Sequence, residues 1–78
     1  MNTLDRYLKN NGTNRFQVSK KANITPSTLQ RAAISPRGVD GITVHVLKAI
    51  ALALNKPIGT VLEELIKESE NDYNEGNK

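Results

Sequence analysis

The chain contains no cysteine and no tryptophan, and only two tyrosines and one phenylalanine occur among its 78 residues. The absence of cysteine excludes disulfides and thiolate metal ligands and is typical of the reducing cytoplasm. The longest apolar run, residues 49–54, is too short to cross a bilayer, and the first residues lack the features of a signal peptide. We therefore expect a cytoplasmic protein that makes no contact with membranes.

The sequence also lacks the residue combinations of an enzyme. It has a single histidine, His45, and neither a nucleophile beside a base nor a glycine-rich phosphate loop. A domain of 78 residues is too small to enclose a large pocket. We expect no catalysis, cofactor, metal or small-molecule substrate, and we expect His45 to face solvent.

Basic residues are concentrated in the first part of the chain. Residues 1–56 contain nine Lys or Arg against two acids, a charge of +7, whereas residues 57–78 contain two against six, a charge of −4. The two parts account for the net charge of +3. This distribution is typical of a protein whose basic part binds a polyanion and whose acidic end serves a separate function. Solvated surface charge with an acidic tail is an equally good interpretation of the charge alone.

Proline, glycine and capping residues divide the sequence into short helical segments without a convincing strand. Apolar residues at helical spacing predict five helices, near residues 4–10, 14–22, 26–33, 43–54 and 59–68. Residues 34–42 are expected to form a loop without regular structure. Residues 69–78 are polar and without period, and we expect a disordered tail. The sequence thus predicts one all-α, five-helix domain over residues 1–68.

Core positions follow from the same periodicity. Tyr7 and Phe16 are assigned to the core, and Leu29 and Ala32 are expected to face inward from the third helix. The buried stripe of the fourth helix is expected to consist of Val44, Leu47, Ala51 and Leu54, with Ile50 beside it.

The break between the second and third helices is the most informative point in the chain. Asn23 tolerates the left-handed conformation that ends a helix, and Ile24 supplies one apolar anchor. Thr25 is a good N-cap, and Pro26 follows at the first helical position. Two short helices joined by such a tight turn predict a helix-turn-helix unit.

The stretch from Asn14 to Arg31 resembles the helix-turn-helix of lambda-type phage repressors, the XRE family. The matching positions in this stretch are Val18, Ser19, Asn23, Ile24, Thr25, Thr28 and Leu29. A second block resembles the last two helices of that family, at Leu47, Ile50, Ala51, Leu54, Ile58, Leu62 and Leu65. The resemblance covers residues 4–66 and implies a lambda-repressor-like domain. The chain departs from the pattern at Asn23, where glycine is favoured, at the small Ala32, and in a longer loop before Thr43.

The resemblance implies sequence-specific binding of double-stranded DNA by a transcriptional regulator, such as a repressor, or by a plasmid or phage copy-control protein. It places helix 26–33 in the major groove, with base edges read by Pro26, Ser27, Gln30 and Arg31. Phosphate contacts are expected from Arg15, Lys20, Thr28, Arg37 and Thr43. Ordinary solvated charge remains the alternative interpretation of the arginines.

The last helix suggests self-association. One short reading helix selects a genomic site poorly, and a two-fold homodimer doubles its contacts. We expect the interface to consist of Val61, Leu62, Leu65 and Ile66. The alternative function is a protein-interaction module of the same fold, such as an antirepressor or antitoxin, because the base-reading chemistry on helix 26–33 is sparse.

Overall fold

A computed structural model describes the backbone of residues 2–76 and the side chains of residues 2–70. Its elements are α1 (Thr3–Asn10), α2 (Arg15–Ala22), α3 (Pro26–Ile34), the 3-10 turn η1 (Gly38–Gly41), α4 (Val44–Leu54) and α5 (Ile58–Gly76). Within the described residues there is no strand, and the all-α prediction with five α-helices is confirmed. None of these helices is long and apolar enough to cross a membrane.

Side-chain caps set the starts of three helices. Asn2, Asn14 and Thr43 each accept a hydrogen bond from the backbone N–H three residues ahead, which satisfies one of the free donors of a helix N-terminus. Asn23 and Asn55 end α2 and α4 in the left-handed conformation, with φ of 55° and 57°. These local signals explain why the helix bounds lie close to those predicted.

The helices enclose one core, to which all five contribute. Its side chains with the least exposure come from every helix: Leu4, Leu8, Val18, Leu29, Val46, Ile50, Val61 and Leu65. Ala32 and Tyr7 are also buried, as predicted. Val39 packs partly on the core from η1, whereas Ile34 at the end of α3 stays 64% exposed.

Two core predictions are wrong for the same geometrical reason. Phe16 is 65% exposed, because the residue two positions along, Val18, lies on the opposite side of α2 and is the one buried. Val44 is 64% exposed, because the buried arc of α4 is centred on Ile50 and includes Val46 instead. Periodicity shows that a helix has an apolar face, but it does not show which side is buried when apolar residues occupy both sides.

Two segments are more regular than predicted. The expected loop 34–42 contains η1, whose Gly41 approaches Ser35 so closely that a Cβ would lie 2.1 Å from the Ser35 Oγ atom. Helix α5 continues to Gly76, so the predicted helix end near Glu68 is wrong. Once its first turns are packed, a helix gains one hydrogen bond per added residue. Residues 77–78 lie outside the described part.

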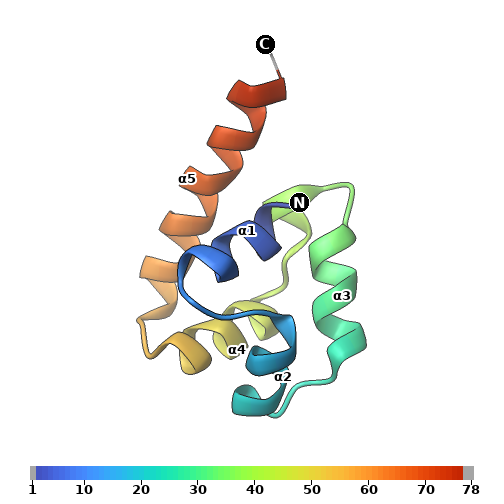
Figure 1. The fold of residues 1–78 in the computed structure, drawn as a ribbon, viewed down its shortest axis with the longest axis vertical. Coiled ribbons are helices and arrows are strands. Elements are labelled where there is room, and N and C mark those ends of the chain that lie inside the picture. Colours follow the sequence, from blue (N-terminus) through green and yellow to red (C-terminus); the bar gives the residue numbers. More distant parts are fainter. Residues whose placement is uncertain (1, 77–78) are drawn as a thin grey trace.

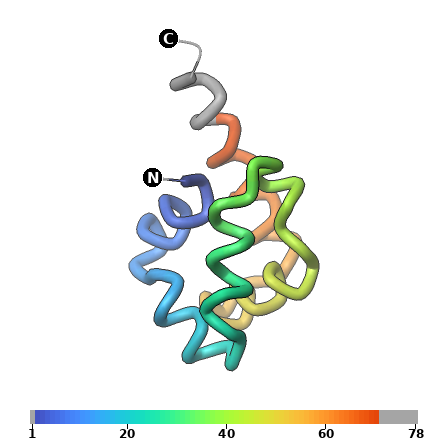
Figure 2. The backbone as a smooth tube through the Cα atoms, turned by 90° about the vertical axis from the view of Figure 1, so that its right-hand side faces the viewer, coloured from blue at the N-terminus to red at the C-terminus, as the bar shows by residue number. Residues whose placement is uncertain are grey.

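The arrangement separates α3 from α5. Figure 1 shows these two helices on opposite sides of the molecule, with α1, α2 and α4 between them. In Figure 2, which looks onto the side that carries α3, that helix runs in front of the rest of the body. The outer face of α3 is therefore open to a large partner.

A polar network ties α5 to α1. The buried Tyr7 donates its hydroxyl hydrogen to Glu64 Oε1 at 2.6 Å, and Lys56 Nζ lies 2.9 Å from the same oxygen. One turn further along α5, the Glu68 carboxylate accepts from Arg6 and Asn10. The hydrogen bonds from Tyr7 and Lys56 lower the pKa of Glu64. Burial, together with the carboxylate, raises the pKa of Tyr7 well above its ordinary value.

We predict that Tyr7→Phe lowers the free energy of unfolding by about 1–2 kcal/mol near neutral pH, because the bond to a carboxylate is lost. This difference from wild type should shrink below pH 4.5, where Glu64 loses its charge as pH falls through its lowered pKa. It should also shrink above pH 10.0, since only the wild-type unfolded state gains a tyrosinate at position 7. Urea titrations at acid, neutral and alkaline pH measure this, and a difference independent of pH would contradict it.

Candidate nucleic-acid interface

The turn between α2 and α3 sets the position of the candidate interface. At its centre Asn23 is left-handed, and its backbone N–H donates to the Ser19 carbonyl oxygen. Ile24 donates its N–H to the same carbonyl at 3.1 Å, and the Ser19 hydroxyl donates back to the Ile24 carbonyl oxygen at 2.7 Å. The Ile24 side chain is buried. The direction in which α3 leaves the turn is therefore fixed by both hydrogen bonding and packing.

Thr25 occupies the N-cap position of α3 as predicted, but its side chain makes no capping hydrogen bond. Its hydroxyl instead lies 2.6 Å from the Thr28 hydroxyl. The Thr28 N–H is already taken by the Thr25 carbonyl oxygen at 3.1 Å, so the hydroxyl finds a side-chain partner. Thr28, a predicted phosphate contact, is half-buried and engaged in this pair.

Three of the four predicted base-reading residues lie together on the outer face of α3. Leu29, Ala32 and Ala33 face the core, which leaves Ser27, Gln30 and Arg31 on the opposite side of the helix. These three residues and Pro26, in the first turn, are exposed, and within the described part of the chain none of their side chains makes a hydrogen bond or ion pair. Their donors and acceptors are thus available to a partner.

Three of the five predicted phosphate contacts line two separate hollows, and the predicted base reader Arg31 shares one of them. Thr28, Thr43 and Arg31 line a hollow of about 230 Å³ between α3 and the start of α4. Arg15 lines another, of about 520 Å³, at the start of α2, together with Lys9. Arg15 therefore lies apart from Thr28 and Thr43, although the sequence assigned a phosphate contact to all three.

The predicted phosphate contacts also differ in whether their side chains already interact with other groups of the protein. The Arg15 Nε atom lies 2.9 Å from Asp5 Oδ1, so a phosphate there competes with an ion pair. Lys20 is exposed, with its Nζ atom 5.0 Å from the centre of the Phe16 ring. Arg37 is exposed in the turn that follows α3. Thr43 uses its hydroxyl to cap α4.

The four residues predicted for the dimer interface do not share one surface. Val61 and Leu65 are fully buried in the core of the chain itself and are unavailable to a second copy, so this part of the prediction is wrong. Leu62 and Ile66 are 39% and 42% exposed. Residues four apart on α5 share one side of the helix, so Val61 and Leu65 form an apolar stripe that faces the core, and Leu62 and Ile66 form another that faces outward.

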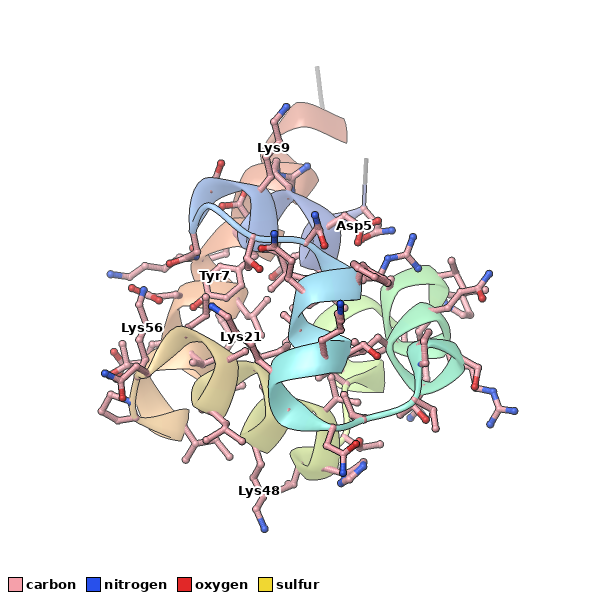
Figure 3. The ribbon with its side chains drawn as sticks, turned by 60° about the horizontal axis from the view of Figure 1, so that its bottom comes forward. Asp5, Tyr7, Lys9, Lys21, Lys48 and Lys56 are labelled. Atoms are coloured by element: carbon pink, nitrogen blue, oxygen red, sulfur yellow. The ribbon has the colours of Figure 1, made fainter. Side chains whose placement is uncertain are left out.

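The sequence analysis missed three features of the surface. Exposed Lys9, Lys21 and Lys48 add positive charge to α1, α2 and α4, and Figure 3 shows Lys48 projecting away from the body. Phe16 is an exposed aromatic side chain beside Arg15. Leu52 on α4 is 67% exposed. A helical wheel anchored on the buried Val18 and Ile50 would have found Phe16 and Leu52.

His45 is exposed, as predicted. Among the described residues no three His, Asp or Glu side chains gather where a metal ion could be held. Comparison with protein-family models, with curated proteins and with solved structures finds no match to this chain.

The left-handed turn gives a test of this geometry. We predict that Asn23→Gly leaves the free energy of unfolding nearly unchanged, whereas Asn23→Ala lowers it by about 1–2 kcal/mol, because alanine is strained at this φ. Thermal and urea unfolding of both variants measure the difference. Asn14 provides the comparison, because it caps the start of α2 and its backbone is extended, not left-handed. Asn14→Gly and Asn14→Ala should both weaken this cap. Equal stability of the two Asn23 variants would contradict the strained turn.

Proposed function

We propose that this chain is a lambda-repressor-like helix-turn-helix protein that binds double-stranded DNA sequence-specifically. In this proposal it acts as a transcriptional or copy-control regulator in the cytoplasm and works as a homodimer. The observation that carries the proposal is the outer face of α3, where the exposed side chains of Ser27, Gln30 and Arg31 have no partner within the described part of the chain. A short helix held by a tight turn with such a face suits entry into a major groove.

The distribution of charge supports the same partner. Acidic side chains on α5 are engaged with α1 on the far side of the molecule from α3 (Figure 1). Arg31 adjoins the hollow at the start of α4, where free backbone N–H groups and Thr43 favour an anion. A base contact from Arg31 and a phosphate contact from Thr43 are therefore compatible in one complex.

The most direct experiment is selection of bound sequences from a random duplex pool. An enriched palindrome supports both sequence-specific binding and two-fold symmetry. Lack of enrichment favours the second candidate, a protein-interaction module of the antirepressor or antitoxin kind. The observation in favour of that candidate is the set of exposed aliphatic side chains on α4 and α5, which includes Leu52 and Leu62.

Salt dependence tests whether the partner is a polyanion. We predict that the logarithm of the association constant falls with the logarithm of salt concentration by about 0.9 for each phosphate neutralised. With about three to six contacts per protomer, affinity should fall steeply over the physiological range. Fluorescence anisotropy with a labelled duplex measures the slope, and a nearly flat dependence would rule out the proposed DNA interface.

Two arginine variants separate base reading from positioning. Arg31→Ala should cost about 1–3 kcal/mol on the selected site and relax preference at one base pair. Arg15→Ala should weaken specific and random duplexes alike and reduce the salt slope. The matched control is Lys67→Ala, which removes an exposed positive charge on α5, outside the predicted interface. If Arg31→Ala and Arg15→Ala affect specific and random duplexes in the same way, α3 is not the reading helix.

A further inference from the structure

An apolar groove with a volume of about 670 Å³ lies between α2, α4 and the start of α5. Among the residues that line it, Ile24, Ala49 and Ala51 are buried and form its floor. Leu52 and Ile58 are 67% and 39% exposed and form its rim. The groove is hollow because the alanines of the floor are small. It therefore offers a concave apolar site to large aliphatic side chains of a partner.

The two helices that form the walls of the groove carry basic residues and no acid. Neither α2 nor α4 contains Asp or Glu. Lys48 and His45 line the groove from α4 and are exposed. Lys21 is also exposed and precedes Ala22, which lines the groove from α2 (Figure 3). Charge complementarity therefore selects a partner that is apolar where it enters the groove and acidic at its margins.

The shape of the groove suits two turns of a helix. Along α4, the lining residues His45 and Leu52 are about 10 Å apart at the helical rise. An amphipathic helix places large apolar residues one turn apart on one side, so two of them can enter a groove of this length. A flat lipid surface does not reach a buried floor behind exposed rim side chains, and a phosphate backbone gains nothing from an apolar floor. Shape and chemistry together favour a protein helix.

We propose that this groove binds an acidic amphipathic helix of a different protein. Two aliphatic side chains of that helix, one turn apart, pack on Ala49 and against Leu52. Its Asp or Glu residues flank these two anchors and pair with Lys48 of α4 and Lys21 of α2. None of the residues predicted to contact DNA or a second copy of the chain lines the groove, so this site is distinct from both.

Selection from a displayed library of helical peptides tests the proposal without DNA. The peptides have about 15 residues, the length at which an isolated helix becomes marginally stable, and one side of the helix is randomised. We expect enriched sequences to carry aliphatic residues one turn apart with Asp or Glu beside them. An enriched peptide should bind Leu52→Glu about tenfold or more weakly than wild type, because the new carboxylate repels its acids. The matched control is Ile34→Glu, which adds the same charge at a similarly exposed aliphatic side chain on α3.

Reversal of one charge on each partner tests the margins of the groove. Lys48→Glu should weaken binding of an enriched acidic peptide about fivefold or more. The same variant should bind more tightly than wild type to a peptide in which Lys replaces the acids. The control is Lys9→Glu, which makes the same change at an exposed lysine on α1, outside the groove. Fluorescence anisotropy of labelled peptides measures these affinities, and circular dichroism establishes that all variants are folded.

The outcomes separate this proposal from other occupants of the groove. Failure to enrich any peptide whose binding requires Leu52 overturns it, and so does enrichment of basic peptides in place of acidic ones. Equal loss of binding in Leu52→Glu and Ile34→Glu overturns it as well. A wild-type dimer in sedimentation equilibrium that Leu52→Glu dissociates would overturn it by assigning the groove to a second copy. No measurement uses DNA, so the proposal and the DNA-binding function can fail separately.

Discussion

The position of α3 depends on the turn formed by Ser19, Asn23 and Ile24. Ser19 contributes both its carbonyl and its hydroxyl to Ile24, and the left-handed Asn23 makes the reversal of direction possible. The buried Ile24 side chain then fixes the turn on the core. Because the backbone groups of the turn are satisfied internally, α3 starts at Pro26 in a defined direction. Every role assigned to the outer face of α3 requires this constraint.

The second organising feature is the separation of charge by the fold. Glu64 and Glu68 are held against α1 by Tyr7, Lys56, Arg6 and Asn10, and this network lies on the side of α5. Acids engaged in this way are kept away from α3, and the paired positive charges of Arg6 and Lys56 partly offset them. The basic side chains of α2, α3 and α4 are therefore left to dominate the rest of the surface.

The small size of the domain explains its exposed aliphatic side chains. A chain of 78 residues has one core, and each helix presents only one side to it. Helices α3, α4 and α5 carry apolar residues on a second side as well, so Ile34, Leu52, Leu62 and Ile66 remain exposed to solvent. Exposed side chains of this kind reduce solubility unless a partner covers them.

Signals confined to a few neighbouring residues were read correctly from the sequence. The left-handed end of α2 at Asn23 depends on the preference of a single residue, so it required no knowledge of the fold. For the same reason the bounds of α1 to α4 could be predicted closely, whereas the end of α5 could not.

Tertiary structure decided the features that depend on which side of a helix meets a neighbour. Phe16 and Val44 lie on the surface because Val18 and Val46 occupy the positions nearest the core. Likewise, Val61 and Leu65 are buried while Leu62 is not, and only the packing of α5 on the body makes that choice. The pairing of Arg15 with Asp5, and of Tyr7 with Glu64, joins different helices. Periodicity along a chain specifies local conformation, whereas the direction of each helix face is set only when the helices pack together.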